Sequence, residues 1–506
     1  MKQPLFSFLL MLFVCTLGTA QTTSIKIVDA ATGEAIPYAN IMVNTTENLV
    51  SNAEGNFTLS QNNVSDTTPI VVSFIGYAPA QTTLGALKDQ DNTIKLVPGI
   101  VELDEVHVSN VRPNIDSIMA GVKRNLKVHY KGNGLAFKDQ LFVRTGSGFY
   151  PKKMDIEITK STGYSKQQLK ENNAELKTFT NKLIQHPPYG FNDMLCNYYT
   201  ALIEKDGKKV FMPKLEVVKA TTLKNGDQPM GLDDIDEMGK KVFMKHLDKN
   251  KYYRIKSGWF GSRDTISLKK GFSVGSGSKK PVETPLTKSK SDLMNFLYRN
   301  NFMQNEKFEF LTELDDYNYT YEGRVYKSDD DYVYVVSFSP DRRSAKYTGK
   351  LYISVDDYAI VRCDYALAEG KTLSGFNMKF LLGVKSSENV SKGTIMYKKN
   401  PEGAGYYLHY ASMETGQYLY INRPLKFIEL SEEEGQVAFD FTVEGNINTK
   451  TEYLNMSRAQ TTNAAVEQQK EPEFTVTTLK RYDPSIWKDY SVIEPLNAMK
   501  QLKAEE

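Results

Sequence analysis

The chain has 506 residues, a length that predicts two or three domains, each large enough to bury its own core. Its 63 Lys and Arg residues nearly balance its 61 Asp and Glu residues, which leaves a net charge of +2. This balance excludes the strong positive field that draws a protein onto nucleic acid or an anionic membrane. The 30 Tyr and 25 Phe residues favour Tyr-rich β-structure.

Residues 1–20 have the features of a signal peptide. Lys2 supplies a positive charge, Leu5–Leu17 is a mostly apolar run, and Gly18–Ala20 offers small residues for cleavage. The apolar run is too short to be a membrane span. We therefore expect an exported protein of the periplasm or the outer membrane, with no transmembrane segment after cleavage. A lipoprotein cysteine at Cys15 is the alternative, but the bulky Val14 stands where such a signal has a small residue.

Cleavage would leave two cysteines, Cys196 and Cys363. Export permits a disulfide, but two distant cysteines with no motif around them do not require one. The simpler prediction is two small buried apolar side chains. Their pairing and the oligomeric state stay open at this stage.

Residues 21–109 predict a small β-sandwich. Short apolar runs recur along this stretch, with turn residues between them, at 25–27, 41–43, 57–59, 71–75, 94–96 and 106–108. Short strands at such intervals, joined by Gly-centred turns, are typical of an immunoglobulin-like sandwich of about seven strands.

The same stretch resembles a known domain family. The pieces IVDAATGEAIPYANIMV, SNAEGNFTL, VVSFIGYAP and LDEVHV follow one another in this order. They look like the carboxypeptidase-regulatory-like (transthyretin-like) domain, which is abundant at the N-termini of exported Bacteroidota proteins, including TonB-dependent receptors. The resemblance implies an accessory module and not a peptidase, because no zinc domain is visible. The chain is also too short for the plug and barrel of a receptor.

Residues 110–130 predict a connecting helix. Asn114 can cap its N-terminus, and the apolar residues that follow fall on one stripe: Ile115, Ile118, Met119, Val122 and Leu126. We expect this stripe to pack on a neighbouring part of the same chain. Docking on a partner is the alternative.

Residues 131–300 predict a mixed α+β part of the body. Strands are expected at 137–143, 154–158, 209–219 and 253–268, and helices at 165–185, 233–247 and 291–299. Residues 271–290, rich in Gly, Ser, Lys and Pro, predict an exposed flexible loop. Whether 131–300 forms a separate domain is left open.

Residues 301–456 predict a large antiparallel sheet. The clearest β-meander lies at 319–365, where apolar and aromatic residues alternate between turns at Ser339–Asp341 and Asp356–Asp357. Further strands are expected at 375–384, 393–398, 406–410, 418–421 and 439–443. A sheet this wide tends to curl. The fold class is therefore mainly β: an immunoglobulin-like sandwich, then an α+β region with a large curved antiparallel sheet or open barrel.

The rhythm of residues 323–365, GRVYKSDDDYVYVVSFSPDRRSAKYTGKLYISVDDYAIVRCDY, is similar to the half-barrel of LolA/LolB-type lipoprotein carriers. This resemblance implies an open sheet whose concave face holds a lipid. Beyond it, the polar, low-complexity residues 457–475 predict a linker. The tail, 476–506, carries Trp487, Tyr490, Val492 and Ile493. These predict docking of the tail on its own chain, with a partner as the alternative.

No catalytic, cofactor-binding or metal-binding residue is predicted. Gly271–Gly275 satisfies G-x-S-x-G with Ser273, but the residues that follow cannot form the helix that this motif requires. The histidines are too scattered to predict a metal site: His107, His129, His186, His246 and His409.

The leading hypothesis is a non-enzymatic cell-envelope protein, without a cofactor, that binds a lipid or other apolar ligand, or an outer-membrane or periplasmic partner. The Tyr-rich runs YYLHY and YLY support a second hypothesis, a glycan- or protein-binding surface module. A serine hydrolase that uses Ser273 is a remote third. Nucleic acid is not expected as a partner.

Overall fold

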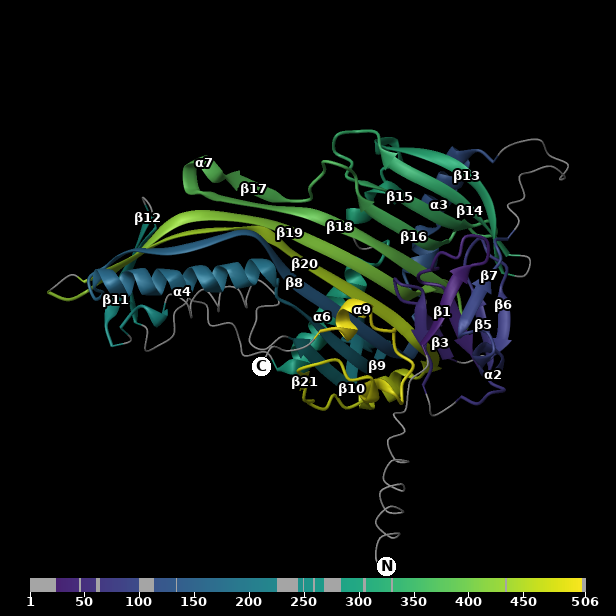
Figure 1. Cartoon of the computed structure of the whole chain (residues 1–506). Helices are drawn as coiled ribbons and strands as arrows, with labels where there is room; N and C mark the ends of the chain where they lie inside the picture. The colour runs from purple at the N-terminus through teal and green to yellow at the C-terminus, as the bar shows by residue number, and fades with distance from the viewer. Residues whose placement is uncertain are drawn as a thin grey trace, which may run out of the picture. The chain divides into compact units, whose positions relative to one another are not determined.

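The computed structural model (Figure 1) describes residues 24–44, 47–60, 64–99, 113–132, 134–224, 244–248, 250–257, 260–267, 284–303, 306–328, 331–432 and 435–502. The chain divides into two compact units. One consists of Met1–Gly99 with Asp483–Asn497, and the other of Ile100–Tyr482 with Ala498–Glu506. The predicted signal peptide lies outside the described residues.

The first unit is a sandwich of two small sheets. One sheet has the strand order β4-β1-β7 and the other β3-β2-β5-β6. Alternate residues of these strands point inward and form an apolar core that includes Ile27, Ile41, Phe57 and Val72. The predicted immunoglobulin-like sandwich is confirmed. Its elements are β1 Ser24–Asp29, β2 Asn40–Val43, β3 Glu47–Val50, β4 Asn56–Thr58, β5 Pro69–Ser73, β6 Ala80–Thr83, α2 Leu84–Lys88 and β7 Thr93–Leu96.

The tail segment Asp483–Asn497 belongs to this unit. The backbone N–H of Ser60 donates to Ser491 Oγ at 3.0 Å, and Asn52 Nδ2 donates to the carbonyl oxygen of Glu494 at 3.2 Å. The Thr58 hydroxyl donates to the Glu494 carboxylate. Ile493 and Trp487 are buried. The predicted docking of the tail on its own chain is therefore confirmed, and the short helix η4 Pro484–Trp487 starts the docked segment.

The second unit is built on one 14-stranded sheet. Its main path runs β13-β14-β15-β16-β18-β19-β20-β8-β9-β10-β21, and β11, β12 and β17 pair beside it. The described pairings are antiparallel except that of β10 with β21. The predicted broad sheet is confirmed, and it is open, because β13 and β21 end the path without pairing with each other. Figure 1 shows the long strands β8, β19 and β20 bending along their length.

The strands of this sheet are β8 Ala136–Ser161, β9 Tyr189–Lys205, β10 Lys208–Lys224, β11 Tyr252–Ser257, β12 Phe260–Ser267, β13 Tyr317–Ser328, β14 Asp331–Pro340, β15 Tyr347–Ser354, β16 Ile360–Leu367, β17 Gly375–Met378, β18 Val384–Lys399, β19 Tyr406–Glu429, β20 Gln436–Thr461 and β21 Thr477–Leu479. The helices of the second unit are α3 Ile115–Tyr130, α4 Lys166–Gln185, α6 Pro285–Arg299, η2 Glu306–Leu311, η3 Leu314–Asp316, α7 Lys379–Leu382 and α8 Asn463–Gln468, and α9 Asn497–Lys500 starts at the last residue of the first unit.

Several strands are longer than predicted. The separate strands expected at 137–143 and 154–158 are one strand, β8, and those at 406–410 and 418–421 are one strand, β19. In β8 the intervening residues include Thr145, Gly146, Ser147 and Gly148, which interrupt the apolar alternation. The ladder with β20 continues through them because backbone hydrogen bonding does not depend on side-chain polarity. Strand β9 was not predicted from the sequence.

Helix starts follow their capping residues. Asn114 Oδ1 accepts from the N–H of Asp116 at 2.8 Å, so the predicted cap of α3 is confirmed, and Ser165 forms a capping box with Gln168 at the start of α4. Helix α6 begins at Pro285 and not at 291, because Thr284 caps it and Pro suits the first helical position. The loop prediction is therefore wrong for 285–290. Residues 271–283, and most of the helix expected at 233–247, lie outside the described residues.

The segment predicted as a linker, 457–475, is partly regular structure. β20 continues to Thr461, and Thr462 then caps α8. Val466 of α8 is buried against Ala136, Tyr199 and Ala201. Val466 alone anchors this short helix, and the polar residues around it make the helix hard to predict from the sequence.

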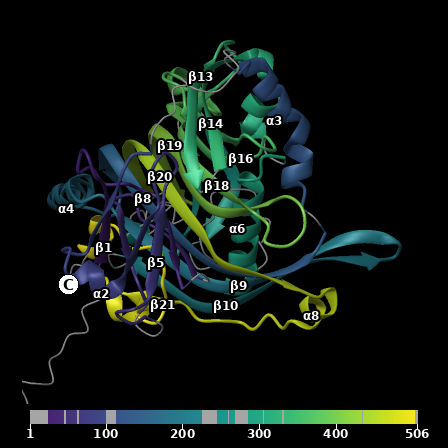
Figure 2. The ribbon, with the colours of Figure 1, turned by 90° about the vertical axis from the view of Figure 1, so that its right-hand side faces the viewer.

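Helices cover one face of the large sheet, here called the inner face. On β20 this face consists of the alternate residues from Val437 to Tyr453. Leu176 and Leu183 of α4 pack on its apolar part, with Phe439 and Phe427. Phe296 of α6 stacks on Tyr453, with ring centroids 5.8 Å apart. Figure 2 shows α3 and α6 beside the strands of this sheet.

Candidate ligand-binding site

A cavity of about 660 Å³ lies between α6 and the inner face of the sheet. Its floor is formed by β8, β9, β10, β19 and β20, and its roof by α6. Phe474 and Val476, which precede β21, complete the wall. A volume of this size is in the range of roughly 300–1,000 Å³ that is typical of small-molecule sites.

The floor has a polar row across four strands, and Met413 extends the row onto a fifth. Pairing in register places Met413, Thr451, Thr145, Asn192 and Thr222 side by side. The hydroxyls of Thr145 and Thr451 are 3.2 Å apart, and Thr222 Oγ1 donates to Asn192 Oδ1 at 2.5 Å. One step along, Ser147 and Thr449 form a second hydroxyl pair at 3.1 Å.

The next row of the floor is apolar. Here Ala411, Tyr453, Val143, Met194 and Ala220 lie in register. From the roof, Leu293 and Phe296 face the cavity. The cavity therefore has an apolar side and a hydroxyl-rich side, which suits a molecule that itself has an apolar and a polar part.

Ion pairs hold the roof in place. Lys290 of α6 donates to Glu471 Oε1 at 2.8 Å, and the same carboxylate accepts the backbone N–H of Leu215 on β10 at 2.9 Å. Burial alone would raise the pKa of Glu471, but these hydrogen bonds and the charges of Lys290 and Lys214 hold it below its ordinary value. The exposed pair Lys288–Asp292, at 3.3 Å, also borders the cavity.

A smaller cavity of about 250 Å³ shares Arg299, Thr415 and Thr449 with the larger one. Beyond it, the Lys307 ammonium donates to the Tyr365 hydroxyl at 3.0 Å and lies 4.7 Å from the ring centre of Phe308. Burial, with a smaller effect from the Arg299 charge, lowers the pKa of Lys307 to about 7. Lys307 lines neither of these two cavities.

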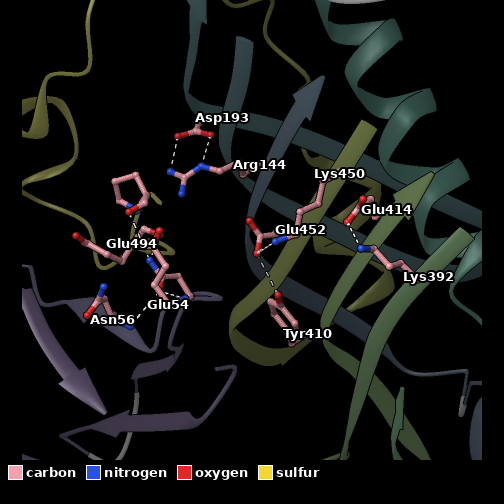
Figure 3. A network of polar contacts seen from close by, with 12 residues as sticks. Glu54, Asn56, Arg144, Asp193, Lys392, Tyr410, Glu414, Lys450, Glu452 and Glu494 are labelled. Carbon is pink, nitrogen blue, oxygen red and sulfur yellow. Dashed lines mark hydrogen bonds and ion pairs between the residues drawn. The ribbon is translucent and has the colours of Figure 1, made fainter. Parts of the chain in front are cut away.

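The opposite face of the same strands carries ion pairs (Figure 3). Arg144 and Asp193 form a bidentate pair at 2.8 and 2.7 Å, and both side chains are almost fully buried. Glu452 accepts from Lys450 at 3.1 Å and from the Tyr410 hydroxyl at 3.3 Å. Asp193 is among the residues that border the larger cavity, whereas Arg144, Lys450 and Glu452 border neither of the two cavities described above. We assign these ion pairs to the stability of the sheet.

The residues weighed for chemistry do not come together. Ser273 and His107 lie outside the described residues. His129 Nε2 is 2.8 Å from the carbonyl oxygen of Asp357, His246 Nδ1 is 3.0 Å from the Tyr164 hydroxyl, and His409 is fully buried. Within the described ranges, no three His, Cys, Asp or Glu side chains gather as a metal site would require.

Cys196 and Cys363 are both buried and do not form a disulfide, which confirms the prediction of two small buried side chains. Burial raises the pKa of each thiol, which makes both poor nucleophiles. The YYLHY run does not form an exposed tyrosine surface, because Tyr406 and Tyr410 are buried. The hypothesis of a glycan-binding surface is therefore weakened, because it depended on exposed tyrosines in this run.

None of the cavity residues was predicted from the sequence as a binding residue. Their signal was present: TGSG in β8 and NTKT in β20 place small and hydroxyl residues where the strand pattern predicts apolar ones. Such an interruption of the apolar pattern also occurs at the end of a strand, but here Thr145, Thr449 and Thr451 of these segments line the cavity.

Residues 25–108 match the model of the CarboxypepD_reg-like domain, which confirms the first resemblance. No curated protein matches the chain. Among solved structures, a DUF1329 family protein from Desulfovibrio piger is 12% identical, with a TM-score of 0.21, over 70% of this chain and 97% of that one. A protein of unknown function from Bacteroides fragilis is 10% identical, with a TM-score of 0.11, over 85% of this chain and 97% of that one. Likenesses this distant support no argument about the chain.

The helices described here include none that is both long and apolar enough to cross a membrane.

Proposed function

We propose that this chain is a non-enzymatic cell-envelope protein that binds an amphiphile, such as a lipid, in the cavity beneath α6. The observation that carries the proposal is the cavity itself, with its apolar row beside a hydroxyl row. The signal-peptide pattern and the CarboxypepD_reg-like domain support an envelope location. An open sheet is the architecture that the LolA/LolB-type resemblance implies.

The ligand's two parts follow from the two rows. An apolar chain would lie against Val143, Met194 and Phe296, where it is removed from water. A polar head would lie on the hydroxyls of Thr145, Thr449 and Thr451, which can donate or accept hydrogen bonds. Hydroxyls suit a neutral or an anionic head equally.

A cavity-filling variant tests this proposal. Ala220→Phe places a ring into the apolar row, whereas Val218→Phe places the same ring at an exposed position of the same strand. We expect a fluorescent fatty-acid analogue to bind residues 22–506 and the Val218→Phe control alike, and to bind Ala220→Phe at least about tenfold more weakly. Equal binding by both variants would contradict the site. Matching urea midpoints would show that both variants are folded.

A further inference from the structure

The turn between β17 and β18 exposes large apolar side chains. Residues 375–385 read GFNMKFLLGVK, and a strand was expected at 375–384. The structure instead has the short strand β17, the helical turn α7 and then β18. Phe380 is fully exposed, Leu381 is 78% exposed, and Phe376 and Met378 are exposed beside them. Contiguous exposed apolar side chains mark an interaction surface more often than single ones do.

The turn has a defined shape. Gly383 closes α7 with a φ of +66°, its N–H donates to the carbonyl oxygen of Lys379 at 3.1 Å, and its own carbonyl oxygen accepts from Asn422 at 2.8 Å. A Cβ atom at position 383 would lie 2.0 Å from the carbonyl oxygen of Asn422, so the position requires glycine. The Lys379 ammonium lies 4.1 Å from the ring centre of Tyr420. Phe380 and Leu381 are therefore presented by a braced turn (Figure 1, α7).

The charged residues of the turn itself are positive. Residues 375–385 contain Lys379 and Lys385 and no Asp or Glu. Arg423 also approaches, with its Cγ atom 3.5 Å from where a Cβ of Gly383 would lie. At a membrane surface, apolar side chains enter the boundary of the acyl chains while nearby Lys side chains reach the phosphates. This combination favours a phospholipid surface over an apolar protein groove.

We propose that residues 375–385 dock the protein on a phospholipid bilayer, with Phe380 and Leu381 entering the boundary between headgroups and acyl chains. The small net charge of the chain does not oppose this, because the positive charges are local. The inference depends on the exposed turn and not on the cavity. Membrane docking can therefore fail its test while ligand binding in the cavity is observed, and ligand binding can fail while docking is observed.

Flotation of residues 22–506 with vesicles tests the docking. One set of vesicles contains phosphatidylcholine alone, and the other contains added phosphatidylglycerol. We expect the protein to float with both, and more strongly with the anionic set. Phe380→Ser with Leu381→Ser should weaken binding to both sets at least about tenfold. The matched control is Val128→Ser with Val218→Ser, which removes exposed apolar side chains from two other elements and should change nothing.

A second variant separates the charges from the apolar contact. Lys379→Gln with Lys385→Gln should remove the preference for phosphatidylglycerol and keep binding to phosphatidylcholine. The proposal is overturned if the wild-type protein floats with neither set. It is equally overturned if the Phe380→Ser, Leu381→Ser variant floats like the wild type, which would mean adsorption elsewhere. All altered side chains are exposed or at the turn, so the urea midpoint should not change.

Discussion

Arg144 and Asp193 show how single residues support the floor of the cavity from its opposite face. They face each other across β8 and β9, one residue from Thr145 and Asn192, which lie on the inner face. Burial alone would lower the pKa of Arg144, but the adjacent Asp193 carboxylate raises it above its usual value. Two buried charges are tolerated here because each satisfies the other with parallel hydrogen bonds.

Removing one partner of the Arg144–Asp193 ion pair should destabilise the folded chain. We expect Arg144→Met to lower the free energy of unfolding by about 3–5 kcal/mol, because it leaves a buried carboxylate unpaired. The double variant Arg144→Met, Asp193→Leu should recover most of that loss, since no buried charge remains. Urea unfolding of the three proteins measures both values. A double variant no more stable than the single one would contradict this explanation.

Lys307 gives a pH dependence with a definite sign. Its pKa is about 7 in the folded chain, against an ordinary value of 10.5. Between these values the unfolded chain binds a proton that the folded chain lacks, so the stability contributed by this group rises with pH. Below about 7 both states are protonated, and the full penalty of a buried charge applies.

We therefore expect Lys307→Met to be more stable than the wild type at pH 6–7, and the difference to shrink as the pH is raised toward 10. Urea midpoints across this range measure it, with the exposed Lys127→Met on α3 as the control. A difference that grows with pH would show that the folded chain stabilises the charged Lys307 ammonium, which contradicts the lowered pKa.

At the scale of elements, the sequence predicted the cap of α3 but missed the start of α6 and the lengths of several strands. The cap at Asn114 was predictable because capping depends on a few adjacent residues. Strand β8 was not predictable as one element, because its middle borders a cavity and contains Thr, Gly and Ser in place of alternating apolar residues. β9 has the same difficulty: Asn192 and Asp193 interrupt its apolar pattern, and each has a partner on a neighbouring strand that no local pattern shows.

Gly121 tests how tightly α3 packs on the sheet. A Cβ atom at this position would lie 2.7 Å from the ring of Tyr358, in the turn before β16. Although Ala favours a helix over Gly by about 1 kcal/mol, we expect Gly121→Ala to destabilise the protein by about 1–3 kcal/mol through this overlap. Thermal or urea unfolding checks it, with the reverse change Ala120→Gly at the neighbouring exposed position as the control. A stabilised Gly121→Ala protein would mean that α3 can move away from Tyr358.

At the scale of the whole molecule, the N-terminal residues and a segment near the C-terminus, Asp483–Asn497, form one unit. The sandwich was predictable from local pattern and resemblance, but its contacts with Ser491 and Glu494 join residues more than 430 positions apart. The tail's aromatic and apolar residues indicated docking, and nothing local indicated the site. The pairing of β20 with β8 is equally long-range, and the large sheet includes the described strands of 131–300, β8 to β12.

The tail contact predicts a local effect. Ile493→Ala should destabilise the first unit by about 2–5 kcal/mol, because Ile493 is buried there. Hydrogen exchange should quicken at the amide of Ser60, which donates to Ser491. The exposed Lys488→Ala serves as the control and should leave exchange unchanged. Unaltered exchange at Ser60 in Ile493→Ala would contradict the docking of the tail.

The most direct test of the account is native mass spectrometry of residues 22–506, exported to the periplasm and purified without detergent. The account predicts a bound mass that extracts as an amphiphile, is present in Val218→Phe, and is absent from Ala220→Phe. A mass equal to the bare chain in all three proteins, in cells rich in lipid, would contradict binding in the cavity beneath α6.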